Sequence, residues 1–141
     1  MFSKALDTVT NFLQEMANMK HVFIETFCAV ETQIKADMTK IQQVIINLVS
    51  NAIKFSPKGG IIRVDATYDE PTEKLKVRVT DTGPGISEED QKKLFKPFGV
   101  IKKTMALNPN GTGLGLYICR KLCEEMGGTI RCKSDVQITT F

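Results

Sequence analysis

The sequence predicts a single α/β domain built on a mixed β-sheet. Amphipathic helical segments alternate along the chain with segments rich in β-forming residues. Two strands follow each other across a short turn, which requires an antiparallel pair and excludes a purely parallel, doubly wound sheet. The length of 141 residues suits one domain, 1–141, with one core.

The first element expected is an amphipathic helix over residues 1–20, with apolar positions at steps of four and three. These positions are Phe2, Leu6, Val9, Leu13 and Met16. Such a stripe is consistent with packing on the domain's own core or with the tail of a longer helix that pairs with a partner. Residues 21–27, rich in β-formers, predict a strand.

A second helix is predicted from Met38 to Phe55, with Asp37 as its N-cap and the segment 56–60 as its stop. One apolar stripe faces the core, formed by Ile41, Ile45, Leu48 and Ala52. A second stripe is polar and consists of Asn47, Asn51 and Lys54. Asn is a mediocre helix former, so two of them on one face of an apolar helix indicate a functional role, with packing against neighbouring backbone as the alternative.

Two strands are predicted at residues 61–68 and 75–81. By the two-residue period, Asp81 shares a face with the apolar residues Leu75, Val77 and Val79. A carboxylate on the buried face needs a partner, because burial of an unpaired charge costs several kcal/mol. Asp81 is therefore a candidate functional residue.

The remaining elements are a short helix from Glu88 to Phe95, a mobile loop over 99–110, and a helix that starts at GTGLGL and ends near Met126. A strand is expected at 129–134, and ITTF begins another. Glycines at a helix N-terminus can bind phosphate through backbone N–H groups, although this signal alone is weak. The motifs of dinucleotide-binding folds, phosphate-loop NTPases and serine/threonine or tyrosine kinases are absent.

Composition narrows the possible functions. The chain is 42% hydrophobic and 25% charged, as in ordinary globular proteins, and its net charge of +3 does not indicate nucleic-acid or membrane binding. The chain contains no membrane-spanning run and no signal peptide, so we expect a cytoplasmic segment. The four cysteines are expected to be small buried hydrophobes in a reducing compartment rather than ligands or disulfides.

The DTG sequence at 81–83 also occurs in aspartic proteases, which use two such motifs in one site. Those proteins are nearly all β, and the protease interpretation leaves the Asn pair and GTGLGL unexplained. A metal-nucleotide site explains all three features. Asp81 would accept the exocyclic amine of the base, Asn51 would offer oxygen to Mg²⁺, and Lys54 and GTGLGL would contact phosphates.

The order of NLVSNAIKF, DTGPGIS, KLFKPF and NGTGLGL resembles the N, G1, F and G2 boxes of sensor histidine kinases. These kinases belong to a superfamily with gyrase, heat-shock chaperone and mismatch-repair ATPases. The resemblance covers the chain from about Val22 to its end. It implies a two-layer α/β sandwich, with a mixed sheet of about five strands covered on one face by about three helices. It also implies a flexible ATP lid over 99–110.

The resemblance further implies roles for individual residues. Asn51 would bind Mg²⁺, Lys54 a phosphate, and Phe55 would lie against the adenine. Asp81 would accept the adenine amine. The other nucleotide-binding positions implied are Asn47, Gly83, Gly85, Ile86, Gly111, Thr112, Gly113, Leu114, Gly115 and Leu116.

Asn47 distinguishes between branches of the superfamily. In the gyrase, chaperone and mismatch-repair branches, and in mitochondrial protein kinases of the superfamily, this position resembles a Glu that serves as base. Hydrolysis needs a base to activate water, and an Asn cannot take a proton. A neutral histidine needs no such base, so Asn47 indicates the kinase branch. Asn47 and Lys54 are the residues expected to be catalytic in phosphotransfer. Alternatives are a pseudo-kinase scaffold and, less favoured, an ATPase.

The family's phosphoacceptor histidine precedes this domain on a helical hairpin, and the one histidine here, His21, lacks that motif. The expected partners are therefore ATP, a histidine-containing dimerisation domain of the parent kinase and, through it, a response-regulator receiver domain. The isolated chain is expected to be a monomer, and its parent can be membrane-anchored.

Overall fold

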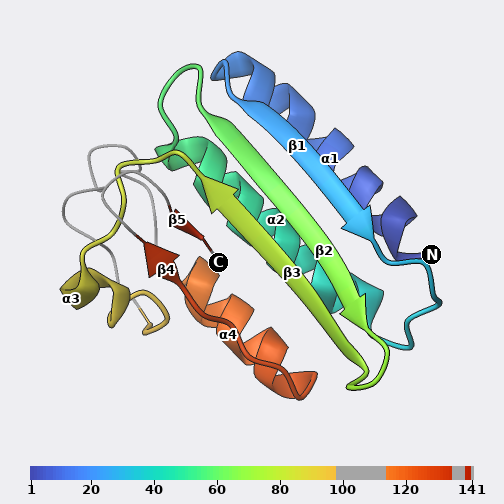
Figure 1. Cartoon of the computed structure of the whole chain (residues 1–141). Helices are drawn as coiled ribbons and strands as arrows, with labels where there is room; N and C mark the ends of the chain where they lie inside the picture. The colour runs from blue at the N-terminus through green and yellow to red at the C-terminus, as the bar shows by residue number, and fades with distance from the viewer. Residues whose placement is uncertain (98–113, 135–138, 141) are drawn as a thin grey trace.

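The chain folds into two layers, a five-stranded mixed sheet and a set of helices that covers one face of it (Figure 1). This computed structural model describes residues 1–97, 114–134 and 139–140. The helices are α1 (Phe2–Met19), α2 (Met38–Phe55), α3 (Glu88–Gln91) and α4 (Gly115–Glu125). The strands are β1 (Phe23–Ala29), β2 (Ile61–Asp69), β3 (Lys74–Asp81), β4 (Lys133–Ser134) and β5 (Thr139–Thr140).

The sheet has the strand order β1-β2-β3-β5-β4. β1 is parallel to β2, and the other neighbouring pairs are antiparallel. Helices α1, α2 and α4 lie on the same face of the sheet, whereas α3 lies beside the ends of β3 and β4 (Figure 1). The predicted fold class, a mixed sheet of about five strands with about three covering helices, is confirmed.

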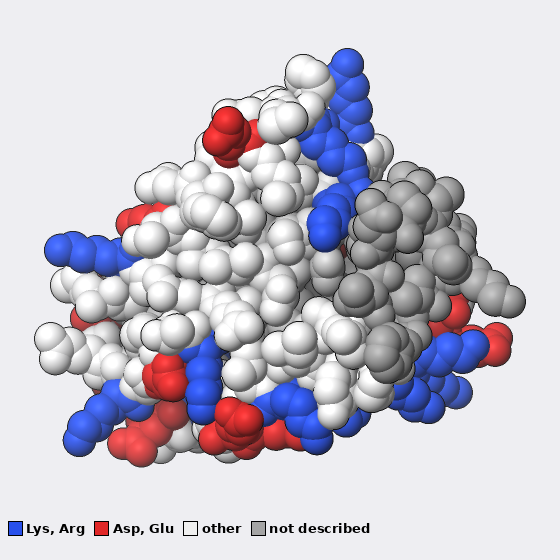
Figure 2. Space-filling model, turned by 180° about the vertical axis from the view of Figure 1, so that it is seen from behind, with Lys and Arg blue, Asp and Glu red and all other residues white. Residues whose placement is uncertain are grey.

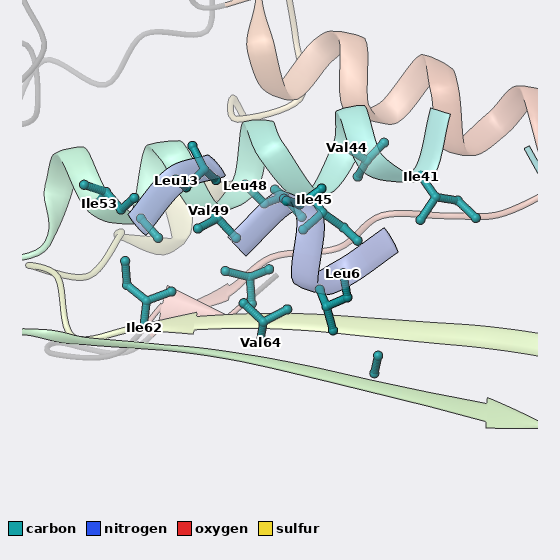
Figure 3. Packing of buried hydrophobic residues seen from close by; sticks show 14 of the residues in the cluster. Leu6, Leu13, Ile41, Val44, Ile45, Leu48, Val49, Ile53, Ile62 and Val64 are labelled. Carbon is teal, nitrogen blue, oxygen red and sulfur yellow. The ribbon is translucent and has the colours of Figure 1, made fainter. Parts of the chain in front are cut away.

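Helix α2 is the central element of the helical layer. The Asp37 side chain accepts a hydrogen bond from the Lys40 backbone N–H and caps the first turn, as predicted. All four residues of the predicted apolar stripe are buried. α2 packs against α1 on one side and α4 on the other, and its residues Ile45 and Val49 point toward the sheet, whereas Val44 points away from it (Figure 3).

The core lies between α2 and the central strands. Ile62, Val64 and Val79 have no measurable exposure, and Val64 and Val79 are paired across β2 and β3. Asp81 is paired with Ile62 in the same register, at the end of β3. Asp81 therefore lies on the buried face of the sheet, as the two-residue period of the strand predicted.

The differences from the prediction include two element boundaries and one core position. α3 ends at Gln91 instead of Phe95, because the following residues form turns with i→i+3 bonds, such as Leu94 N–H to Gln91 O. Only Lys133 and Ser134 of the expected strand 129–134 pair with a neighbour. In α1, Met16 is 41% exposed, and Ala17 takes its place in the core.

The outer surface of the helical layer has few charges. Figure 2 shows this face with Lys, Arg, Asp and Glu gathered around its rim and an uncharged centre. The sequence gives the reason, because α2 has no charged residue between Lys40 and Lys54. No helix in the described part of the chain is long and apolar enough to cross a membrane.

Candidate nucleotide-binding site

A pocket opens where the C-terminal half of α2 meets the end of β3, and six segments contribute to its wall. It is lined by Asn51, Ala52, Phe55, Asp81, Pro84, Gly85, Ile86, Leu94, Leu116 and Thr139. Most of these side chains are apolar, and polar groups come from Asn51, Asp81 and Thr139. An apolar slot with a few fixed polar groups suits a flat heteroaromatic ring.

Asp81 is the buried acceptor of this pocket, with 5% of its surface exposed. Its Oδ1 accepts a hydrogen bond from the Gly83 N–H at 2.8 Å. Burial raises the pKa of Asp81 to about 6, and the bond from Gly83 opposes this rise. Within the described part of the chain the Gly83 N–H is a donor to this carboxylate, whose oxygens can accept further hydrogen bonds from a ligand amine.

The turn after Asp81 depends on its glycines. A Cβ on Gly83 would lie 2.7 Å from Asp81 Oδ1 and 3.3 Å from the Phe55 carbonyl oxygen, so any side chain there would displace the acid or the end of α2. Gly85 has a φ of 75°, which other residues rarely adopt. These two positions, with Ile86 beside them, place the predicted G1 turn on the wall of the pocket.

The side chains of the polar stripe of α2 do not all point into the pocket. Asn51 and Phe55 line the pocket. Asn47 instead has its side chain hydrogen-bonded to Cys119 on α4, whose Sγ also lies 3.9 Å from the Val44 carbonyl oxygen. Burial raises the pKa of Cys119 to about 11, so the thiol stays protonated.

Lys54 is half-buried and is not among the lining residues. Its carbonyl oxygen accepts a hydrogen bond from the Lys20 side chain, which ties the end of α2 to the end of α1. The structure thus brings Asn51, Phe55, Asp81, Gly85 and Ile86 to the pocket and leaves the Asn47 and Lys54 side chains outside its lining.

The predicted phosphate segment lies at the start of α4. Leu116 lines the pocket, and Leu114 and Gly115 form the first turn of the helix, whose N-cap makes no side-chain hydrogen bond. Gly111, Thr112 and Gly113 lie outside the described residues, as does the predicted lid at 99–110. The described part of the segment therefore places a helix N-terminus next to the pocket.

Sequence reasoning did not select Thr139 for the site. It is 5% exposed, lines the pocket, and is the direct partner of Asp81 across β3 and β5. Sequence analysis also missed Pro84 and Leu94 as lining residues. The signal that could have found Thr139 is weak, since it is a threonine in a two-residue strand far along the chain from Asp81.

The described residues contain no group of three or more His, Cys, Asp or Glu side chains that could hold a metal by themselves. The oxygen of the Asn51 side chain is a hard, neutral donor of the kind that Mg²⁺ accepts. A cation bound here would need most of its ligands from a phosphate-bearing molecule and water. The donor set thus fits a metal that arrives with a nucleotide better than a resident metal.

Comparison with known proteins agrees with this geometry. Residues 36–141 match the family described as histidine kinase-, DNA gyrase B-, and HSP90-like ATPase. The sensor protein GacS of Pseudomonas syringae pv. syringae is 38% identical over 128 residues, which are 88% of this chain and 14% of that protein.

Two solved structures are similar throughout. The catalytic domain of the histidine kinase ThkA, in a nucleotide-free form, has a TM-score of 0.83 and 33% identity, covering 99% of this chain and 88% of that one. Full-length ShkA, solved in complex with AMPPNP, has a TM-score of 0.85 and 25% identity, covering 100% of this chain and 29% of that one. ThkA has also been solved with the response regulator protein TrrA.

The fold and the pocket define an ATP-binding catalytic domain of the kind found in two-component kinases. The chain belongs to the family of histidine kinase-, DNA gyrase B- and HSP90-like ATPases. It spans about one seventh of the length of GacS.

Proposed function

We propose that this domain binds Mg·ATP and donates the γ-phosphate to a histidine on a separate dimerisation domain of its parent kinase. The observation that carries the proposal is the mostly apolar slot with the buried Asp81 as its acceptor, next to the start of α4. The family match and the similarity to kinase catalytic domains support the same assignment.

Adenine would enter the apolar part of the pocket, with its exocyclic amine donating to the Asp81 carboxylate. Phe55 would lie along the base, and Gly83, Gly85 and Ile86 would form the turn over it. Asn51 would hold Mg²⁺, which would neutralise phosphate charge. Backbone N–H groups of the segment 111–116 would bind the phosphates, because a helix N-terminus favours anions.

Asn47 and Lys54 would act on the transferred phosphate. Both lie on the polar stripe of α2, one helical turn from Asn51, so a change of side-chain rotamer would turn them toward phosphates in the pocket mouth. Asn47 would orient phosphate or metal-bound water, and Lys54 would contribute charge. Catalysis would rest on positioning and charge stabilisation, since a neutral histidine is already a nucleophile.

Calorimetric titration with a non-hydrolysable ATP analogue and Mg²⁺ tests binding. We expect saturable binding, and a folded domain that binds nothing at millimolar nucleotide would refute the proposal. Phosphotransfer is tested by mixing the domain with labelled ATP and the histidine-containing domain of its own parent. Label on that domain separates a kinase from a non-catalytic scaffold, which would bind ATP without transfer.

A third outcome would indicate an ATPase of the gyrase or chaperone type. Because Asn47 stands where those branches need a base, we expect almost no steady ATP hydrolysis by the isolated domain. The proposed downstream partner is a response-regulator receiver domain that takes the phosphate from the histidine. We further propose that the segment works in the cytoplasm as a monomer, whether or not the parent is anchored in a membrane.

The role of Asn51 has its own test. In Asn51→Ala the pocket loses the proposed metal ligand and keeps its adenine contacts. We expect the affinity for the ATP analogue to fall at least tenfold with Mg²⁺ present and by less than threefold with a chelator, an energy difference of about 0.7 kcal/mol or more. Equal losses with and without Mg²⁺ would exclude Asn51 as a ligand of the metal.

A further inference from the structure

A group of hydrogen bonds outside the pocket holds the turn that follows β3. The Ile86 N–H donates to Ser134 Oγ on β4 at 2.8 Å. Gln91 Nε2, at the end of α3, donates to the Ile86 carbonyl oxygen at 2.7 Å and to the Ser134 carbonyl oxygen at 3.2 Å. Both backbone polar groups of Ile86 are therefore held by side chains, and we name these bonds the Ser134–Gln91 clamp.

The clamp connects two parts of the pocket wall. Ile86 lines the pocket, and Ser134 Oγ also lies 2.9 Å from Thr139 Oγ1, which belongs to another lining residue. Thr139 is in turn the cross-strand partner of Asp81. Ser134 and Gln91 do not line the pocket themselves. One serine oxygen thus joins the turn to the strand beside the acid.

The turn needs an external support of this kind. Its residues 83–85 are Gly-Pro-Gly, so it has almost no side chains with which to pack, and glycine loses more backbone entropy on ordering than any other residue. β4 is only two residues long and contributes few ladder bonds. Because packing and ladder bonds contribute little here, side-chain hydrogen bonds are the main interactions that hold Ile86 in position.

We propose that Ser134 and Gln91 are positioning residues that keep the 83–86 turn in the geometry that receives the nucleotide base, and so set nucleotide affinity without touching the nucleotide. The inference rests on the proposed function, because it concerns the same pocket. It extends that function to residues on β4 and α3 that belong to none of the four sequence boxes.

The first test compares Ser134→Ala with Ser134→Thr, which keeps the hydroxyl, and with Lys133→Ala, an exposed neighbour on the same strand. For Ser134→Ala we expect affinity for the Mg·ATP analogue to fall about five- to tenfold, the loss that a net hydrogen bond produces. Ser134→Thr and Lys133→Ala should stay within twofold of the parent. Equal losses in the Ala and Thr variants would overturn the role of the hydroxyl.

Gln91→Ala provides a second test should Ser134→Ala fold poorly, because it removes a half-buried amide and leaves β4 unchanged. We expect a loss of about three- to fivefold, since the amide holds one side of the same turn. The double variant Ser134→Ala, Gln91→Ala should lose less than the product of the single losses, because both act through Ile86. A fully multiplicative loss, or wild-type affinity in folded Gln91→Ala, would contradict a shared clamp.

Hydrogen exchange of the Ile86 amide in the ligand-free domain tests the clamp apart from any nucleotide. We expect exchange at least tenfold faster in Ser134→Ala and unchanged in Ser134→Thr, with core amides of β2 and β3 unaffected in both. Failure of the parent domain to bind nucleotide would sink the proposed function and leave this arm intact. Unchanged Ile86 exchange in Ser134→Ala would sink the clamp itself.

Discussion

At the scale of single residues, Asp81 shows a conflict between stability and binding. Its carboxylate is 5% exposed, and its pKa is raised to about 6 by burial. The folded state therefore holds the acid's charge at a cost when the pH is above that value. The same desolvated acceptor is what a nucleotide amine can use.

The substitution Asp81→Asn separates the two effects. The amide keeps an oxygen for the Gly83 N–H but presents an N–H to the adenine amine in place of the second carboxylate oxygen, so we expect at least a tenfold loss of affinity, about 1.4 kcal/mol. The ligand-free variant should be more stable than the parent at pH 8, by about 1–3 kcal/mol, because no charge is buried. Calorimetry and urea unfolding measure both. Unchanged affinity would remove Asp81 from the adenine site.

The pH dependence of the parent follows from the same shift. The folded pKa of about 6 lies above the ordinary aspartate pKa of 3.8, so the folded state binds more protons between these values. The contribution of Asp81 to stability is fully present below about pH 4 and is lost as the pH rises through about 6. The stability advantage of Asp81→Asn should therefore grow from pH 4 to pH 7 and then stay constant. Parallel pH profiles for the two proteins would contradict this assignment.

Adenosine provides the matching binding measurement, because it has no phosphate to titrate. Binding through the ionised carboxylate should weaken as the pH falls below about 6, by up to tenfold per unit, since the acid must first lose its proton. NMR titration of the domain at pH 5 and pH 7.5 measures this difference. In Asp81→Asn the two affinities should be equal.

Ser56, at the end of α2, is 2% exposed, and its buried side-chain oxygen has no hydrogen-bond partner among the described residues. Its hydroxyl bears a desolvation cost that no contact offsets. We expect Ser56→Ala to leave stability unchanged or to raise it by up to about 1 kcal/mol. Thermal unfolding measures this. A loss above about 1 kcal/mol would mean that the hydroxyl has a partner, such as a buried water.

At the scale of elements, α2 contributes both to the core and to the pocket, and its two ends have different roles. Asp37 caps the N-terminus, whereas Asn51 and Phe55 reach the pocket at the other end. A helix of 18 residues is about 27 Å long, so these ends are well separated. Changes at the cap should affect stability without affecting binding.

Asp37→Ala tests this separation. Loss of the bond to the Lys40 N–H and of the negative charge at the helix N-terminus should cost about 1 kcal/mol of unfolding free energy. Asp37→Ser, which can still cap, should recover most of it. Nucleotide affinity should stay within twofold in both variants. A large loss of affinity in Asp37→Ala would show that the cap and the pocket are coupled along the helix.

The same elements show what a sequence can and cannot predict. The bounds of α2 were predicted to the residue, because both signals are local: Asp37 at its start and Pro57 just beyond its end. Asp81 was placed on the buried face by strand parity alone. α3 was predicted too long, because the backbone after Gln91 forms turns with i→i+3 bonds instead of continuing the helix.

The part of the site that escaped prediction is non-local. Thr139 and Ser134 enter the pocket region only because β5 pairs between β3 and β4, an arrangement set by contacts between segments more than 50 residues apart. Short strands also carry little pattern of their own, as the two-residue β4 illustrates. The side-chain direction of Asn47, toward Cys119, likewise depends on the packing of α4 on α2.

At the scale of the whole molecule, the pocket joins both layers. Its lining residues come from α2 and α4 in the helical layer and from β3 and β5 in the sheet, with the turn 83–86 closing one side. A ligand seated there contacts elements that otherwise meet through the core. Binding should therefore stabilise the cooperative unit and not one local segment.

This coupling has a measurable size. A ligand that binds only the folded state raises the free energy of unfolding by about 2.7 kcal/mol at one hundred times its Kd. For a domain of 141 residues, we expect an ATP analogue with Mg²⁺ to raise Tm by roughly 8–14 °C at that concentration, since about 1 kcal/mol shifts Tm by 3–5 °C.

Asp81→Asn is the matched control for this measurement, since its ligand-free Tm should equal or exceed that of the parent. At the same analogue concentration its shift should be smaller, because a tenfold weaker Kd removes about 1.4 kcal/mol of the linkage. On binding of the analogue, backbone hydrogen exchange should slow in all three of β3, α2 and α4. Protection confined to one of these elements would show that the ligand does not bridge the helical layer and the sheet.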